Sequence, residues 1–122
     1  MDVLAALKRV PEFAHVPEVH LQWLMQNSTL ATHADGDYIF RKGDAINELR
    51  IVLQGEVKLY REQAGNLRHF GVIESYEITG LLPYSRMKNA SAMGVSGGQT
   101  IALVLHKDFF NEMIRDHHPL TE

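Results

Sequence analysis

Residues 36–44 read GDYIFRKGD and residues 51–57 read IVLQGEV, and these two stretches decide the fold. In the first, a short β-rich run lies between two turns, each marked by a Gly-Asp pair. Gly36 and Gly43 suit such turns because glycine adopts positive φ angles without steric cost. In the second, Gly55 interrupts a β-rich run, which predicts a bulge or a close approach of another backbone segment.

The middle of the chain continues in short β runs separated by turn residues. Residues 49–53 alternate as a half-buried strand does, and residues 67–73 follow a turn that contains glycine. Residues 90–95 and 100–105 are predicted to form a hairpin around residues 96–99. About eight short strands at this spacing predict a mainly β fold, a double-stranded β-helix or jelly roll.

Short helices are predicted at both ends of the chain. Asp2 is a suitable N-cap for a first helix, which Pro11 prevents from continuing. A second helix is predicted to start at Pro17, the residue favoured at the first helical position. Residues 107–116 form an apolar face at helical spacing and predict a last helix. We expect these helices to pack on the β-roll.

Length and composition place limits on the class of protein. The chain has 122 residues, no cysteine and a formal net charge of −3. This length predicts a single domain over residues 1–122, large enough for a core without disulfides. The slightly acidic balance gives no electrostatic footprint for nucleic acid or an anionic membrane. No export signal or membrane-length apolar run is present, so we expect a soluble, cytoplasmic protein without nucleic-acid partners.

Few residues match a catalytic or metal-binding pattern. The sequence has no cysteine nucleophile, no Gly-x-Ser-x-Gly elbow and no Walker-type phosphate loop. It also lacks the His-x-His pair that would hold a metal on a strand, and adjacent His117 and His118 point apart on a helix. We therefore expect no catalytic residue, no metal and no cofactor. A cupin-type metalloenzyme remains the least favoured alternative.

Residues 76–91 form an irregular segment between two β blocks and carry the candidate site. Thr79 is predicted to cap a short helical turn through Leu82, whose free backbone N–H groups would suit an anion. Arg86 offers a fork of donors for a phosphate, and Glu77 can accept hydrogen bonds from a sugar hydroxyl. The plainer interpretation is that Arg86 is solvated and that Glu77 pairs with a neighbouring basic residue.

The order and spacing of these stretches resemble the cyclic-nucleotide-binding domain family. This is the sensory β-roll of Crp-type regulators and of cyclic-nucleotide-gated kinases and channels. Residues 36–44 match the family pattern G-x-x-I-F-x-x-G-D, and residues 51–57 match I-V-L-x-G-x-V. Residues 101–110 match the returning strand and the start of the last helix. The resemblance covers nearly the whole chain and implies the same β-roll.

The resemblance also assigns roles within residues 76–91. In the family, a glutamate of the phosphate-binding cassette holds the ribose 2′-hydroxyl and an arginine holds the cyclic phosphate. These roles fall on Glu77 and Arg86. The segment also resembles a variant cassette seen in sensory regions placed N-terminal to bacterial histidine kinases. The ligand-binding residues implied are Glu77, Ile78, Thr79, Gly80, Leu81, Leu82, Ser85 and Arg86.

The function implied is regulatory rather than enzymatic. The domain would bind cAMP, cGMP or a related phosphorylated ligand and pass the signal through its C-terminal helix to an output domain of the histidine-kinase type. The alternative is a degenerate roll that acts by dimerisation, since Tyr76 and Met87 replace small residues of the family cassette. The family continues into a long helix after residue 116, so we expect a fragment of a longer signalling protein.

Overall fold

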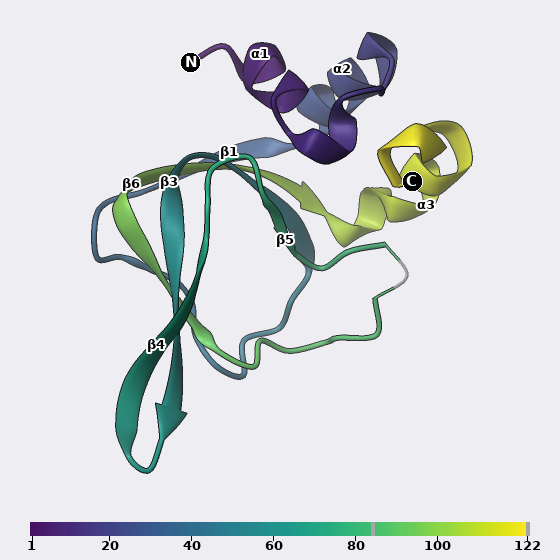
Figure 1. The fold of residues 1–122 in the computed structure, drawn as a ribbon. Coiled ribbons are helices and arrows are strands. Elements are labelled where there is room, and N and C mark those ends of the chain that lie inside the picture. The colour runs from purple at the N-terminus through teal and green to yellow at the C-terminus, as the bar shows by residue number, and fades with distance from the viewer. Residues whose placement is uncertain (84, 122) are drawn as a thin grey trace.

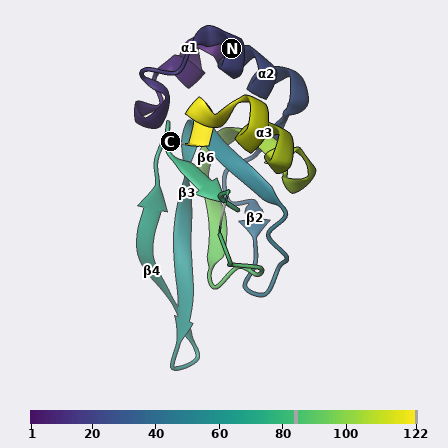
Figure 2. The ribbon, with the colours of Figure 1, turned by 90° about the vertical axis from the view of Figure 1, so that its right-hand side faces the viewer.

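The structure is a computed structural model that describes residues 1–83 and 85–121. An antiparallel β-roll forms one end of the molecule, and helices from both ends of the chain pack together at the other (Figures 1 and 2). The strands in the described residues are β1 (Thr29–His33), β2 (Tyr38–Phe40), β3 (Glu48–Gln63), β4 (Asn66–Ile73), β5 (Ile78–Gly80) and β6 (Met93–His106). The α-helices are α1 (Val3–Lys8), α2 (Glu18–Asn27) and α3 (Phe110–Asp116), with short 3-10 helices at Pro11–Phe13, Lys107–Phe109 and His118–Thr121.

The sheet folds on itself because its two long strands take part in both halves. The strand order is β1-β6-β3-β4, while β2 pairs with β6 and β5 pairs with β3. The first half of β3 pairs with β5 and the end of β6, and its second half pairs with β4 and the start of β6. β3 and β6 therefore each supply two strands of the roll. This confirms the predicted mainly β jelly roll with short flanking helices.

Gly55 is the residue at which β3 bends between the two halves. Its φ is +77°, and the register of β3 against β6 shifts between Gln54 and Glu56. A Cβ atom at position 55 would lie 2.4 Å from the carbonyl oxygen of Gln99. Both the backbone conformation and the close approach of β6 require glycine here, as the interrupted β run predicted.

The predicted hairpin around residues 96–99 is wrong. Residues 93–106 instead form the single strand β6, which runs antiparallel to β3 from Met93 opposite Tyr60 to His106 opposite Glu48. Gly98, with a φ of +68°, lies where the β3–β6 register shifts. Pairing with β3 therefore keeps residues 93–106 in one strand, which bends at Gly98. The local turn residues alone suggested that the chain reverses its direction here.

The main core lies between the helices and one face of the sheet. Alternate residues of β3 and β6, including Leu49, Ile51 and Leu105, are buried in one cluster with side chains from the helices. The helical members are Leu7, Val10, Phe13, Leu21, Trp23, Leu24 and Met113. The opposite face of β3 carries Arg50 and Val52 and faces the interior of the roll.

The predicted helices are present with closely similar bounds. Asp2 caps α1 by accepting a hydrogen bond from the Ala5 N–H at 3.1 Å, and α2 begins one residue after Pro17. Lys107 to Asp116 forms a 3-10 turn followed by α3. Within the described residues, no helix is long and apolar enough to cross a membrane.

Candidate functional site

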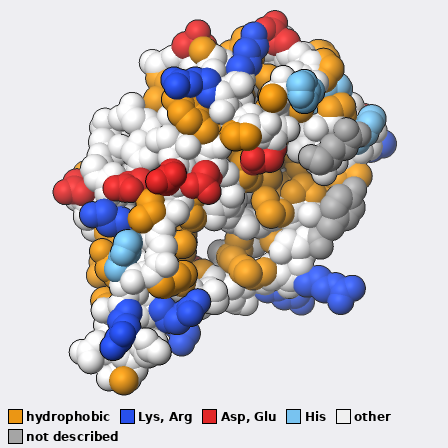
Figure 3. Space-filling model, in the orientation of Figure 1, with side chains coloured by type: hydrophobic (Ala, Val, Ile, Leu, Met, Phe, Trp, Pro, Cys, Tyr) orange, Lys and Arg blue, Asp and Glu red, His pale blue; other side chains and the backbone are white. Residues whose placement is uncertain are grey.

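A cavity of about 600 Å³ opens inside the roll. Figure 3 shows it as a hollow between β4 and the segment that leads into β6, with apolar side chains on its walls. The strands β3, β4 and β5 form one side, and the segments before β3 and before β6 form the other. A volume of this size suits a small organic ligand.

The apolar part of the wall combines bulky and small side chains. Phe40 and Leu59 line the cavity from β2 and β3, and the buried residues Ala90 and Ala92 line it from the segment before β6. A Cβ atom on Gly94 would lie 2.5 Å from the Phe40 ring. Glycine at this position in β6 therefore leaves the space that the Phe40 ring occupies at the cavity wall.

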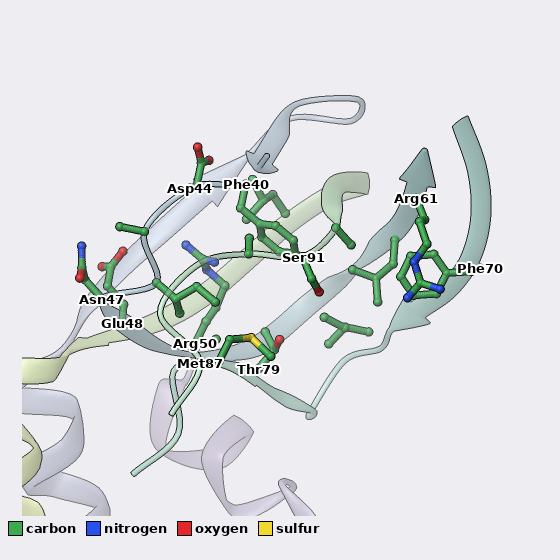
Figure 4. A pocket seen from close by; sticks show the side chains of 18 residues that line it. Phe40, Asp44, Asn47, Glu48, Arg50, Arg61, Phe70, Thr79, Met87 and Ser91 are labelled. Atoms are coloured by element: carbon green, nitrogen blue, oxygen red, sulfur yellow. The ribbon is translucent and has the colours of Figure 1, made fainter. Parts of the chain in front are cut away.

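Arg50 is a half-buried charged residue in this wall. Its neighbours Leu49 and Ile51 point into the core on the other face of β3, so the strand directs Arg50 into the roll. Figure 4 shows the side chain lying between the segment that carries Asp44 and the strand that carries Thr79. Burial lowers the pKa of Arg50 by removing water from the guanidinium, and the Glu48 carboxylate acts in the opposite direction.

The guanidinium of Arg50 is incompletely satisfied. Its Nε atom is fully buried and has no hydrogen-bond partner. Among the described residues, none forms an ion pair with Arg50. A buried donor without a partner costs free energy, and more when the group is charged. The cavity wall therefore carries a charged side chain that forms no ion pair within the described residues.

Arg61 and Phe70 form a flat surface at the outer end of the cavity (Figure 4). The guanidinium carbon of Arg61 lies 4.4 Å from the centre of the Phe70 ring. The Phe70 side chain is 46% exposed. A partly exposed aromatic ring paired with a guanidinium is a surface on which a planar group can stack.

Only part of the predicted cassette reaches this cavity. Thr79 and Gly80 line it, from β5. Residues 78–80 pair with Leu49–Ile51 of β3, and the Leu81 N–H donates to the Glu48 carbonyl at 2.8 Å. The predicted helical turn capped by Thr79 is therefore wrong, because strand pairing uses the backbone groups that such a turn would have left free.

The structure does not bring Glu77 to the cavity. Glu77 is exposed in the turn before β5, and its carboxylate accepts a hydrogen bond from the Glu74 N–H at 2.8 Å. It lines a shallow surface pocket together with Arg9 and Tyr76. Tyr76 has a φ of +71°, and its ring lies under the Arg9 guanidinium at 4.8 Å. This face lies outside the large cavity.

Ser85 and Arg86 follow β5 in an exposed segment. The Ser85 hydroxyl accepts a hydrogen bond from the Met87 N–H at 3.2 Å. Met87 lines the large cavity, whereas Ser85 and Arg86 are absent from the part of its wall that the structure describes. Glu77 and Arg86, the two residues with predicted ligand roles, therefore both lie outside the described wall of the large cavity.

Ile78 and Leu82 face the C-terminal helices instead. They line an apolar groove of about 280 Å³ together with Met113 of α3 and Leu120. Thr79, between them in sequence, lines the large cavity. The residues around β5 therefore separate the large cavity from the elements at the C-terminus.

Trp23 of α2 connects that C-terminal helix to the rest of the domain. Its ring stacks on His117 with centroids 4.4 Å apart, and its indole N–H donates to the Glu112 carboxylate. The Nδ1 atoms of His20 and His117 are 2.8 Å apart. In residues 1–83 and 85–121, no group of three or more His, Asp or Glu side chains is arranged to hold a metal ion.

Sequence reasoning missed Arg50. The signal that could have identified it is strand alternation, since Arg50 and the buried Val52 share one face of a strand whose other face is apolar. A strand buried on both faces has no solvated position for a guanidinium. An arginine there points to a partner inside the fold or to a ligand.

Comparisons with known proteins agree with this architecture. A family model described as Cyclic nucleotide-binding domain matches residues 31–117. The N-terminal domain of a transcriptional regulator from Streptomyces coelicolor A3(2) is 25% identical with a TM-score of 0.81, and the match covers 95% of this chain and 84% of that one. A comparison with curated protein sequences gave no match.

Two further structures show the same fold at lower identity. The regulatory domain of Toxoplasma gondii PKA, crystallised with cAMP, is 21% identical with a TM-score of 0.78, covering 94% of this chain and 44% of that one. The catabolite activator protein of Thermus thermophilus is 22% identical with a TM-score of 0.78, and the match covers 90% of this chain and 52% of that one. This chain thus spans about half of each of these two proteins. Because the family match covers most of the sequence, the chain belongs to the cyclic nucleotide-binding domain family.

Proposed function

We propose that this domain is a regulatory sensor that binds cAMP, cGMP or a related small phosphorylated ligand in the cavity inside the roll. Family membership and the size of the cavity support this proposal. The structural similarity to a PKA regulatory domain that was crystallised with cAMP supports the choice of ligand class. The planar base would lie toward Phe70, and the sugar and phosphate toward Thr79.

The signalling part of the proposal rests on the alternating directions of the side chains along β5. Thr79 lines the cavity, while Ile78 lines the groove that contains Met113 of α3. A ligand that contacts Thr79 would shift the position of Ile78 and hence the packing of the C-terminal helix. Such a shift requires the ligand to bind the two arrangements with different affinities. The output domain would follow α3, and the cassette resemblance favours a histidine kinase.

A second candidate function keeps the fold and omits the ligand. Met87 lines the cavity at a position where the family cassette has a small residue, and Glu77 and Arg86 are not brought to the cavity wall. A roll of this kind would act by dimerisation. The two candidates differ in whether a nucleotide binds the purified domain.

Isothermal titration calorimetry distinguishes these functions. We expect saturable binding of cAMP or cGMP by the wild-type domain and loss of binding in Ser91→Trp, which places a large ring at the cavity wall. Gln63→Trp, at the exposed end of β3, is the matched control and should bind like wild type. Equal binding by Ser91→Trp would place the ligand elsewhere. Absence of binding together with a stable dimer in sedimentation would favour the second candidate.

A further inference from the structure

His20 of α2 and His117 at the end of α3 are in direct contact, at the helical end of the domain (Figure 2). Their Nδ1 atoms are 2.8 Å apart, and their rings meet edge to face with centroids 5.0 Å apart. We propose that this histidine pair is a pH-sensitive contact. It holds the end of α3 and the following 3-10 helix His118–Thr121 on α2, and it releases them when both histidines carry a proton charge.

The hydrogen bond between the two imidazoles requires at least one neutral ring. A neutral imidazole has one donor and one acceptor nitrogen, whereas a charged imidazole has two donors and no acceptor. With one neutral ring, the Nδ1–H of one histidine can donate to the Nδ1 of the other. With two charged rings, two N–H groups would face each other at 2.8 Å and two positive charges would repel. The contact therefore accommodates one positive charge but not two.

The surroundings of His117 favour the first charge on this residue. His117 is the C-cap of α3, and its backbone N–H donates to the Met113 carbonyl at 2.9 Å. The C-terminus of a helix favours a positive charge. The hydrogen bond from Arg115 lowers the pKa of Asp116, and the positive charge of His117 acts in the same direction. Since Asp116 and His117 attract each other, the second charge has to be placed on His20.

The surroundings of His20 oppose that second charge. Burial lowers the pKa of His20, and the positive charges of His117 and His118 act in the same direction. The helix α2, the end of α3 and the 3-10 helix after it thus all contribute to keeping His20 neutral while these elements are packed together.

The carboxylates on the same helices are engaged with other partners. Glu18, the acidic residue of α2, accepts a hydrogen bond from the Lys8 ammonium at 2.9 Å. Glu112 of α3 accepts one from the Trp23 indole. Among the described residues, no carboxylate forms an ion pair with His20. A charge on His20 would therefore have no acidic group to compensate it.

The elements held by the histidine pair border the apolar groove beside β5. The Leu120 N–H donates to the His117 carbonyl at 3.0 Å, and Leu120 lines the groove. Met113, one turn before His117, is only 2% exposed in the main core. Loss of the contact should therefore free His117 and Leu120, while Met113 keeps the first part of α3 in place. Release is then a local change that opens the groove.

Acid is the condition that should cause release. Because the pKa of His20 in the packed arrangement is below the ordinary value of 6.5, the released arrangement binds the extra proton more readily. The stabilisation is present above that value and is lost as the pH falls through the lower pKa. One proton changes the ratio of the two arrangements by at most about tenfold per pH unit. The inference involves no ligand, so it stands apart from the proposed function.

A pH titration by histidine side-chain NMR tests the coupling between the two rings. The full domain is titrated without ligand from about pH 8 to about pH 5. In His117→Gln, the pKa of His20 should be higher than in wild type, because the facing charge is removed. His15→Gln, at an exposed histidine outside the pair, is the matched control and should leave the pKa of His20 unchanged. The same pKa for His20 in wild type and His117→Gln would overturn the inference.

Amide hydrogen exchange tests the release itself. After correction for the intrinsic effect of pH on exchange, protection of the His117 and Leu120 amides should fall by up to about tenfold per pH unit in acid, whereas β6 keeps its protection. His20→Gln retains a side chain that can form hydrogen bonds but does not titrate, so protection at these two amides should change little with pH. An equal loss in this variant and in wild type, or an equal loss at β6, would contradict a local release by the histidine pair.

Discussion

Arg50 on β3 and Thr79 on β5 are directly paired across the sheet, and both side chains line the cavity inside the roll. The adjacent pair in the same ladder, Ile51 and Ile78, faces the opposite way and packs in the core with the helices. Two neighbouring residue pairs of β3 and β5 therefore face the cavity on one side of the sheet and the helical end of the domain on the other. Under the proposed function, this arrangement would give a short physical route from a bound ligand to α3.

Truncation of Ile78 should separate ligand binding from the response of the C-terminal helix. Trp23 is the only tryptophan and contacts both His117 and Glu112, so its fluorescence reports the docking of α3. In wild type, we expect cAMP to change the Trp23 emission. In Ile78→Ala, we expect cAMP to bind in calorimetry but to change the Trp23 emission only slightly. The substitution removes most of the side chain through which β5 lines the groove beside α3.

The matched control for Ile78→Ala is Leu30→Ala, which removes a side chain that is 51% exposed on β1. It should bind cAMP and change its fluorescence as wild type does. A full fluorescence response in Ile78→Ala would show that the signal does not pass through this contact.

The charge balance around Arg50 predicts a preference between two nucleotides. cAMP carries one negative charge, whereas AMP is largely a dianion at neutral pH. Because Glu48 and Asp44 line the same cavity, we expect cAMP to bind at least roughly tenfold more tightly than AMP. Competition calorimetry measures the ratio. Glu48→Gln removes one of these two carboxylates and should bring the affinities for cAMP and AMP closer together. An unchanged affinity ratio would argue against the charge argument.

Substitution of Gly55 tests the bend that closes the roll. Gly55→Ala places a Cβ atom 2.4 Å from the Gln99 carbonyl oxygen at a φ of +77°. We expect a loss of roughly 2–5 kcal/mol in the free energy of unfolding, from conformational strain and the clash together. Gly43→Ala has a similar φ of +92° but no atom within 4 Å, so it should cost only about 1–2 kcal/mol. Equal losses in chemical denaturation would mean that the close approach of β6 is unimportant.

The contact between His20 and His117 predicts a loss of stability in acid. Burial lowers the pKa of His20, and the positive charges of His117 and His118 act in the same direction. Because the folded-state pKa is below the unfolded value of 6.5, the contribution to stability is present above that value. It is lost as the pH falls from the unfolded pKa through the folded one. The geometry agrees, since two nitrogens 2.8 Å apart can share only one proton.

Thermal denaturation between about pH 7.5 and about pH 5.5 measures this effect. We expect the melting temperature of wild type to fall more steeply than that of His20→Gln. His33, whose pKa is also lowered chiefly by burial, contributes a slope in the same direction that remains in the variant. Identical slopes for the two proteins would exclude a role for His20. Wild type and His20→Gln both keep Trp23 and Glu112, which form a hydrogen bond between the same two helices.

Much of the fold could be predicted because its signals are local. Asp2 and Pro17 mark helix starts through their own chemistry, and Gly55 marks the bend through its conformational freedom. The hairpin predicted around residues 96–99 failed because β6 continues through its glycines to pair with β3 along its whole length. Partner strands that are distant in sequence decide such a case, and local turn residues do not.

The candidate site was less predictable for the same reason. The role of Thr79 as a helix cap followed from local pattern, but pairing with Arg50 makes residue 79 part of a strand. Glu77 was selected by its spacing from Arg86, whereas its position depends on the turn in which its carboxylate binds the Glu74 N–H. Arg50 lies outside the predicted segment, and only the folded sheet brings it beside Thr79.

Backbone amide NMR with cAMP is the measurement that tests the central claim most directly. If the ligand occupies the cavity inside the roll, the largest saturable shifts should occur at Arg50, Thr79 and residues 87–92, with smaller shifts at Met113 of α3. Shifts confined to the outer surface around Arg9 and Glu77, or no saturable shift at all, would contradict a ligand site inside this roll.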